Sequence, residues 1–268
     1  MVQRARPQDR LIARIESVLA GRPFVLAAWV SGSLAAGQAD EHSDVDVAAG
    51  VRDESLGEPD ETWRALADEV EHLVYCGVRR SHDGILVNAV TAGWERFDIL
   101  LVPAARVASG VPGPIAVLFD RMGGVRQTAA RRQPPSPARL RDVVDEFIRC
   151  LGLLGVVGPR QEWLAAMGGT LLMRQLLIEL LLAENGEVIG VGSALRLNRR
   201  LADAQRELLL GLPPLAPTRD AILAHQLALA NAFLPRARRL LSAYGVAFPV
   251  EFERATRDHL RRRLGVTL

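Results

Sequence analysis

Short apolar runs separated by turn residues fill the first half of the chain, and they change to helical spacing in the second half. Runs of five to seven branched and aromatic residues, bounded by turn residues such as His82-Asp83-Gly84, predict β-strands. We expect strands at 24–30, 45–51, 73–78, 85–90, 97–102 and 115–119, and helices at 10–20 and 62–72. This mixture predicts an α+β domain with a small mixed β-sheet flanked by helices.

The second half predicts a bundle of helices. Ser136 and Pro137, after the proline-rich segment 131–137, are typical of the N-cap and first turn of a helix. One apolar face then follows at helical spacing: Leu140, Val143, Val144, Phe147, Ile148, Leu151 and Leu154. Segment 170–183 is apolar almost all round, as a central buried helix is, and Asn185-Gly186 would end it. Further helices are expected at 193–210, 220–243 and 249–264, with Pro235 kinking or splitting the second. The expected domains are 1–133 and 134–268.

Composition excludes little but sets the available chemistry. All 33 basic residues are Arg, so any cationic contact to a phosphate must come from Arg or His. Residues 1–100 hold 10 Arg against 17 acidic residues, and residues 101–268 hold 23 against 14. No continuous apolar run reaches the ~18 residues that span a membrane, and the N-terminus has no secretory signal pattern. We therefore expect a cytoplasmic protein without a membrane partner.

Two segments carry the chemistry. Gly32-Ser33 follows the first expected strand, and Asp44-Val45-Asp46 opens the second. Because side chains alternate along a strand, Asp44 and Asp46 point to the same face, where two carboxylates stay ionised only beside a positive charge. Oxygen ligands of this kind suit Mg²⁺, and a glycine lets the backbone approach a phosphate. Asp98 interrupts the apolar run 97–102 and is the expected third carboxylate, since a buried acid is costly without a partner.

These residues resemble the signature of the DNA polymerase β-type nucleotidyltransferase superfamily: an apolar strand, Gly-Ser, about ten residues, Asp-x-Asp and a later carboxylate on a strand. The size and order of the halves are similar to the antibiotic-modifying branch, which includes lincosamide and aminoglycoside nucleotidyltransferases. Segment 117–123 and Arg160-Gln161-Glu162-Trp163 are further local similarities. Gln161 stands where the relatives have Gly, which leaves the roles of Arg160 and Glu162 open.

The resemblance implies a catalytic nucleotidyltransferase domain at 1–133 and a helical substrate-binding domain at 134–268. Asp44 and Asp46 would hold two Mg²⁺ ions, and Asp98 would complete a metal site or accept the proton of the acceptor hydroxyl. Gly32 and Ser33 would bind the triphosphate of ATP or another nucleoside triphosphate. The reaction would transfer a nucleoside monophosphate to a hydroxyl of a small molecule, releasing pyrophosphate, as in antibiotic resistance by modification.

Several alternatives stay open at this stage. The basic second half also suits a toxin-like enzyme that modifies tRNA or protein, although the Arg run at 261–263 lacks interleaved aromatic residues for stacking. A catalytically silent partner module is disfavoured by three clustered acids. Other polar and aromatic residues have structural interpretations beside functional ones: His42, Trp94, Arg160, Glu162, Trp163, Arg174 and Glu179. The sequence does not name the acceptor, the preferred nucleotide or the oligomeric state.

Overall fold

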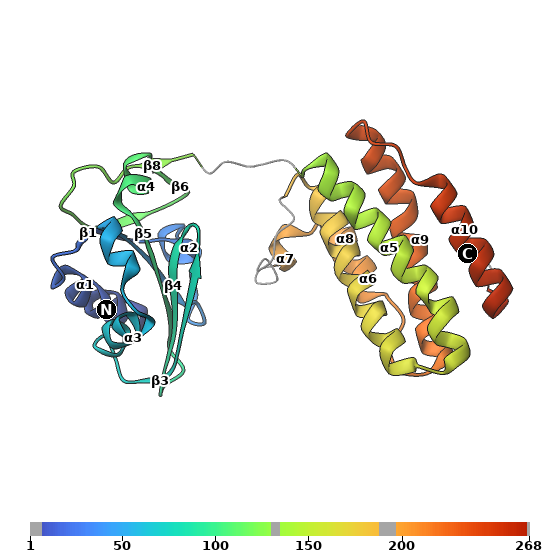
Figure 1. Ribbon diagram of the computed structural model, residues 1–268, viewed down its shortest axis with the longest axis horizontal. Helices are drawn as coiled ribbons and strands as arrows, with labels where there is room; N and C mark the ends of the chain where they lie inside the picture. Colours follow the sequence, from blue (N-terminus) through green and yellow to red (C-terminus); the bar gives the residue numbers. More distant parts are fainter. Residues whose placement is uncertain (1–6, 130–134, 188–196, 267–268) are drawn as a thin grey trace, which may run out of the picture. The chain divides into compact units, whose positions relative to one another are not determined.

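The protein is described by a computed structural model that covers residues 7–129, 135–187 and 197–266. It divides into two compact units, Met1–Arg131 and Arg132–Leu268. The first unit combines a sheet with helices, and the described residues of the second form helices and no strand (Figure 1). This confirms the predicted α+β class with a small mixed sheet followed by a helical bundle.

The first unit is built on a six-stranded sheet in the order β3-β4-β5-β2-β1-β7. Its strands are β1 (Val25–Val30), β2 (Val45–Val51), β3 (Leu73–Ser81), β4 (Gly84–Thr91), β5 (Arg96–Pro103) and β7 (Ala116–Asp120). Strands β2 and β5 are parallel, whereas the other neighbouring pairs are antiparallel. The sequence predicted every one of these strands, within three residues at each end.

One face of the sheet packs on α1 (Pro7–Ala20) and α3 (Asp60–Asp68). Alternate residues of the strands point into this layer, and helix residues such as Ile15 and Trp63 are fully buried against them. The two expected helices are confirmed, but α3 ends four residues before the predicted end. Because this face takes the odd-numbered residues of β2 and β5, the even-numbered ones point to the other face.

The other face is covered only in part. A smaller core forms where Ala27, Trp29, Ala48 and Val102 contact Val107 of α4 (Ala104–Ala108). Two short parallel strands, β6 (Val111–Pro112) and β8 (Gln127–Thr128), lie beyond α4 and were not expected from the sequence. They are too short to produce a periodic signal.

The end of β7 is fixed by two neighbouring side chains. The Asp120 carboxylate accepts hydrogen bonds from the backbone N–H groups of Met122, Gly123 and Val125, each at 2.9 Å. The Arg121 guanidinium donates to backbone carbonyls at and beyond the C-terminal end of α1, which have no partner within the helix. Segment 117–123 therefore forms a structural junction between β7, α1 and the loop that follows β7.

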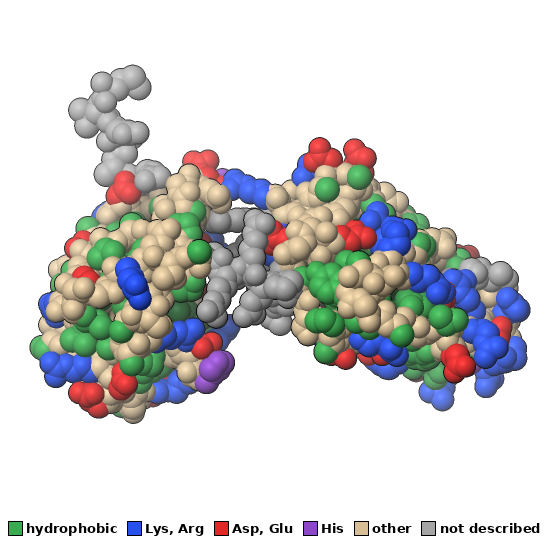
Figure 2. Space-filling model, turned by 90° about the horizontal axis from the view of Figure 1, so that it is seen from above, with side chains coloured by type: hydrophobic (Ala, Val, Ile, Leu, Met, Phe, Trp, Pro, Cys, Tyr) green, Lys and Arg blue, Asp and Glu red, His purple; other side chains and the backbone are tan. Residues whose placement is uncertain are grey.

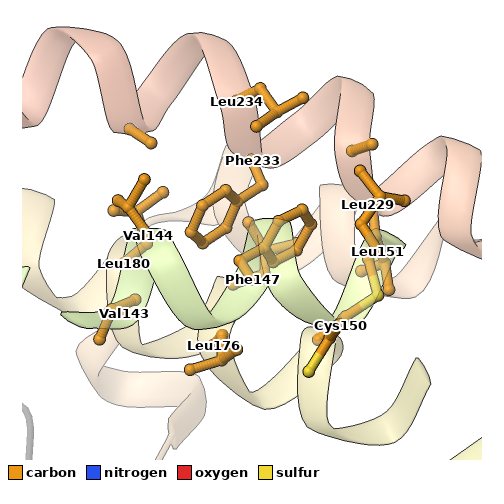
Figure 3. Packing of buried hydrophobic residues seen from close by; sticks show 14 of the residues in the cluster. Val143, Val144, Phe147, Cys150, Leu151, Leu176, Leu180, Leu229, Phe233 and Leu234 are labelled. Atoms are coloured by element: carbon orange, nitrogen blue, oxygen red, sulfur yellow. The ribbon is translucent and has the colours of Figure 1, made fainter. Parts of the chain in front are cut away.

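The helical unit consists of α5 (Pro137–Val157), α6 (Trp163–Glu184), α7 (Leu197–Arg200), α8 (Asp203–Leu210), α9 (Arg219–Ala243) and α10 (Val250–Leu264). Its core is apolar and continuous, and Phe147 of α5 stacks on Phe233 of α9 with ring centroids 3.7 Å apart (Figure 3). The predicted face of α5 is buried, and Ser136 caps that helix by accepting from the N–H of Arg139. Asn185 and Gly186 end α6 as expected.

Three features of this unit add to what the sequence predicted. Helix α9 is one continuous helix through Pro235, so of the two predicted outcomes, a kink or a split, the split does not occur. The helix expected at 193–210 is in part outside the described residues, and the remainder forms two helices, α7 and α8. Gln161 adopts a left-handed backbone conformation with φ of 56°, the conformation that glycine tolerates best. A glycine would therefore suit this position.

Helix α6 is long and apolar enough to span a membrane by length and composition, in contrast to the shorter run expected from the sequence. It packs on α5 and α9, and Thr170, buried at its centre, hydrogen-bonds Gln226 of α9 at 2.8 Å. These contacts are those of the central helix of a bundle. Arg side chains are numerous on the face of the helical unit seen in Figure 2, with acidic side chains among them.

Candidate active site

The predicted acids lie on the open face of the sheet, in one row across neighbouring strands. Asp46 of β2 is the direct partner of Asp98 on β5. Asn88 of β4 is the direct partner of Asp98 on its other side. Because partners in adjacent strands are about 5 Å apart and point the same way, the three polar side chains form a continuous strip.

Asp44 extends this strip toward the N-terminal end of β2. It lies one residue before the strand and two before Asp46, so it belongs to the same face. Its carboxylate is 3.8 Å from the guanidinium of Arg96, which also donates to the carbonyl of His42. All three acids are half-buried, and the structure therefore brings them to one patch of the sheet.

The surroundings of Asp98 disfavour its charged form. Burial raises the pKa of this carboxyl above its usual range, and the neighbouring charge of Asp44 raises it further. A hydrogen bond from Asn88 and the positive charges of Arg96 and Arg79 act in the opposite direction, and the pKa remains raised. A carboxylate with a raised pKa is a better proton acceptor near neutral pH than an ordinary one.

Gly32 and Ser33 open a short helical turn beside these acids. The N–H of Ser31 donates to the carbonyl of Asp46 at 2.8 Å, and α2 (Gly32–Ala35) follows directly. Gly32 has φ of 62°, and a Cβ atom at this position would lie 2.0 Å from Oδ2 of Asp46. Glycine is therefore required here twice, by the backbone conformation and by the closeness of the carboxylate.

Ser33 is placed differently from the sequence expectation. Its side chain is 1% exposed, and its hydroxyl oxygen is buried without a hydrogen-bond partner among the described residues. Contact between this hydroxyl and a phosphate would need the side chain to turn outward. The exposed backbone of Gly32 is the nearer candidate for that contact.

Asn88 was missed by the sequence analysis. The signal was present, because an asparagine is unusual inside an apolar strand and the run 85–90 is otherwise apolar. Its side-chain oxygen is buried and has no partner among the described residues. Asn88 therefore holds Asp98 with its amide nitrogen and leaves an acceptor atom beside it.

The other polar candidates are engaged elsewhere or exposed. Glu179 forms an ion pair with Arg139 at 2.8 Å within the helical unit. His42 is exposed beside Glu41, and Glu162 is exposed at the start of α6. Trp94 is 77% exposed in the turn between β4 and β5, with φ of 61°. These placements do not assign a catalytic role to any of them.

Among the described residues, no three His, Cys, Asp or Glu side chains converge closely enough to form a ready-made metal site. Mg²⁺ does not need one, because it is commonly held by one or two carboxylates together with waters and substrate phosphates. Asp44, Asp46 and Asp98 offer only oxygen donors on one partly exposed patch. This donor set fits a Mg²⁺ site that a bound nucleotide completes.

Comparisons with known proteins leave the family open. No protein-family model matches the chain. No curated protein matches it in sequence. Among solved structures, the chain is similar to an aminoglycoside 6-adenyltransferase from Bacillus subtilis, with 14% identity and a TM-score of 0.41 over 96% of this chain and 98% of that one. A likeness at this level assigns no activity, so the case for function depends on the site residues.

Proposed function

We propose that this chain is a magnesium-dependent nucleotidyltransferase that moves a nucleoside monophosphate, AMP from ATP, to a hydroxyl of a small molecule. The observation that carries the proposal is the row of acids beside a glycine turn. Asp46 and Asp98 are register partners on parallel strands, Asp44 shares their face, and Gly32 contacts Asp46 so closely that no side chain fits. Carboxylates at this spacing can bind a divalent cation, and the accessible backbone next to them can bind the polyphosphate that the cation accompanies.

In this mechanism the residues mainly position groups and balance charge. Asp44 and Asp46 would hold Mg²⁺, which when bound would supply positive charge to neutralise the phosphates and the oxygens of an in-line displacement. The exposed backbone at Gly32 would bind the β- and γ-phosphates, joined by the Ser33 hydroxyl once that side chain turns outward. Arg96, beside Asp44, moderates the repulsion between the acids before the nucleotide binds.

Asp98 receives the proton. The oxygen of the acceptor hydroxyl attacks the α-phosphorus and forms the new P–O bond. The bond between the α-phosphorus and the bridging oxygen breaks, pyrophosphate leaves with its electron pair, and the hydroxyl proton passes to the Asp98 carboxylate. The pKa of Asp98, raised by burial and by Asp44, suits this role.

The test is pyrophosphate release from each nucleoside triphosphate with Mg²⁺, measured against lincosamides, aminoglycosides and bulk tRNA. We expect release with one small acceptor and a loss of at least 100-fold in kcat on Asp44→Ala or Asp46→Ala, with the fold retained by circular dichroism. Asp53→Ala removes an exposed acid outside the strip and serves as the matched control.

Other outcomes would redirect the assignment. Release with tRNA alone, together with steeply salt-dependent binding, would favour the nucleic-acid-modifying alternative. If calorimetry detects no magnesium-dependent nucleotide binding, the enzyme hypothesis is contradicted. The catalytically silent partner module is then the remaining hypothesis. Equal activity of Asp44→Ala and Asp53→Ala would remove the acids from the mechanism.

A further inference from the structure

A pocket of about 230 Å³ lies on the same open face as the acids. Its walls come from three central strands, from α4 and from β6, and they include Trp29, Ala48, Leu100, Val102, Val107 and Val111. Helix α4 closes over β2 because Gly50 has no side chain, since a Cβ atom there would be 2.7 Å from Val107. The pocket is thus a built feature of the first unit.

The register of the sheet places this pocket one step from the acids. Trp29, Ala48 and Leu100 are successive partners across β1, β2 and β5. Each lies two residues along its strand from the row of Ser31, Asp46 and Asp98, on the same face. Two residues of a strand span roughly 6.6 Å. A hydroxyl attached to a group in the pocket can therefore reach the carboxylates across a distance about the width of a sugar ring.

The pocket and Gly32 lie on opposite sides of the row of Asp46 and Asp98, and Ser31 of that row contributes to the pocket lining. Strand β1 runs antiparallel to β2, so the chain passes Trp29 beside Ala48 before it reaches Ser31 beside Asp46. Gly32 then lies past the row of Asp46 and Asp98, toward the N-terminal end of β2, where Asp44 also lies. In an in-line displacement the attacking oxygen enters opposite the leaving group. With pyrophosphate at the Gly32 turn, the acceptor enters from the side of the pocket.

The lining selects against a cationic guest. Among the described residues that line the pocket there is no Asp or Glu, and the one charged side chain is Arg106. Arg106 is fixed at the rim by the Asp83 carboxylate at 2.6 Å and the Asp83 carbonyl at 3.0 Å. A cation here would lose its hydration without a carboxylate in the lining to replace it, whereas an apolar group would gain from burial.

We propose that this pocket binds a compact apolar group of the acceptor and thereby presents the neighbouring hydroxyl to Asp98. The acceptor is then a neutral hydroxyl compound with an alkyl or aryl substituent, and a polycation is a poor substrate. This inference deepens the proposed function and rests on it, because the direction of attack is taken from the nucleotide site.

The test uses the full chain with Mg²⁺ and ATP, and a neutral hexose, its hexyl and phenyl glycosides, and an aminoglycoside as acceptors. Pyrophosphate release gives kcat and KM. Calorimetry with Mg²⁺ and a non-reacting ATP analogue gives the affinity for the phenyl glycoside and for the nucleotide separately. We expect the substituted glycosides to have KM values at least tenfold below that of the hexose, with the aminoglycoside poorest.

Two pocket variants and one control make the result specific. Ala48→Leu fills the pocket from β2 and Val111→Phe fills it from β6, so each should weaken phenyl glycoside binding at least tenfold while the affinity for the nucleotide stays within twofold. Val74→Leu, on the exposed edge strand β3, should change neither affinity. The second pocket variant keeps the test decisive if Ala48→Leu fails to fold.

Four outcomes would overturn the inference. A preference for the aminoglycoside would exclude an acceptor subsite of this chemistry. Weaker nucleotide affinity in both pocket variants, with glycoside affinity unchanged, would assign the pocket to the nucleobase. Nucleotide binding without binding of any glycoside would reject the inference and leave the proposed function standing, whereas absence of magnesium-dependent nucleotide binding would reject both.

Discussion

Single residues determine whether the acidic side chains can occupy their positions on the open face of the sheet. Gly32 is the most direct example. Its left-handed backbone and its closeness to Asp46 are separate constraints. Gly37 offers a comparison, because it has nearly the same φ, 65°, but a Cβ atom added there would meet none of the described residues within 4 Å. The two glycines therefore separate the cost of the backbone conformation from the cost of displacing a carboxylate.

We expect Gly37→Ala to lose about 1–2 kcal/mol of stability, because alanine is strained in the left-handed region. Gly32→Ala should lose at least as much, because its methyl group must also displace the Asp46 carboxylate. Only Gly32→Ala should lose magnesium-dependent nucleotide binding, by at least tenfold, because its methyl group displaces the Asp46 carboxylate. Urea unfolding and calorimetry measure the two effects. Equal nucleotide affinity in the two variants would contradict a role for the contact.

The charged Asp98 carboxylate should lower the free energy of unfolding when no divalent cation is present. Its pKa is raised in the folded state, so folding favours the protonated acid, and this contribution is lost as pH rises through the folded pKa. We therefore expect Asp98→Asn to be more stable than the parent in urea at pH 7, with the difference shrinking as pH falls toward about 4.

Two controls accompany the Asp98 measurement. Asp120→Asn should be less stable than the parent by about 1–2 kcal/mol at pH 7, because that carboxylate accepts three backbone hydrogen bonds. Mg²⁺ with nucleotide should raise the Tm of both the parent and Asp98→Asn, because Asp44 and Asp46 remain to hold the cation. Lower stability of Asp98→Asn at pH 7 without cations would refute the argument.

At the scale of elements, the parallel pairing of β2 and β5 creates the site. A shift of one residue in this register would move Asp46 opposite a residue that points to the buried face. The register is held by the buried odd-numbered residues, including Val45, Val47, Phe97 and Ile99, which pack under α1 and α3. Core packing on one face thus aligns the acids on the other.

Helix α9 contains a proline, Pro235, and remains continuous because buried neighbouring residues hold it in place. Pro235 is exposed and removes one helical hydrogen bond, yet the helix continues because Phe233, Leu234 and Ala237 are buried around it. We expect Pro235→Ala to stabilise the helical unit by roughly 1–3 kcal/mol, measured by urea unfolding. Arg239→Ala, an exposed change on the same helix, should be within about 0.5 kcal/mol of the parent. A destabilised Pro235→Ala would show that the proline fixes a bend that the bundle needs.

At the scale of the molecule, each unit has its own apolar core. The strip of acids, the glycine turn and the apolar pocket all belong to the first unit, whereas the stacked pair of Phe147 and Phe233 belongs to the second. Loss of packing in the helical core should therefore not remove the proposed nucleotide site.

We expect Phe233→Ala to lower the stability of the helical unit by about 3–5 kcal/mol while magnesium-dependent nucleotide affinity stays within threefold. Trp163 is the one tryptophan in residues 132–268, so its fluorescence reports on that unit, and calorimetry reports on the nucleotide. Ala67→Val, an overpacked change in the buried core of the first unit, is the converse control. Loss of nucleotide binding in folded Phe233→Ala would show that the helical unit takes part in that site.

The sequence by itself determined the fold class, the six strands of the sheet and the principal helices, because apolar periodicity records which faces are buried. It also predicted that Gly32 lies in a turn and that Asp44 and Asp46 share one face of a strand, with Asp98 on another strand. This was possible because the alternation of side chains along a strand is a local property.

Only the tertiary structure decided which residues meet. Strand order and register made Asp46 and Asp98 neighbours, added Asn88 to their row and set the pocket at Trp29, Ala48 and Leu100 one step away. It also buried the Ser33 hydroxyl and let α9 run through Pro235. These outcomes depend on contacts between segments far apart in the chain, whose energies no local pattern contains.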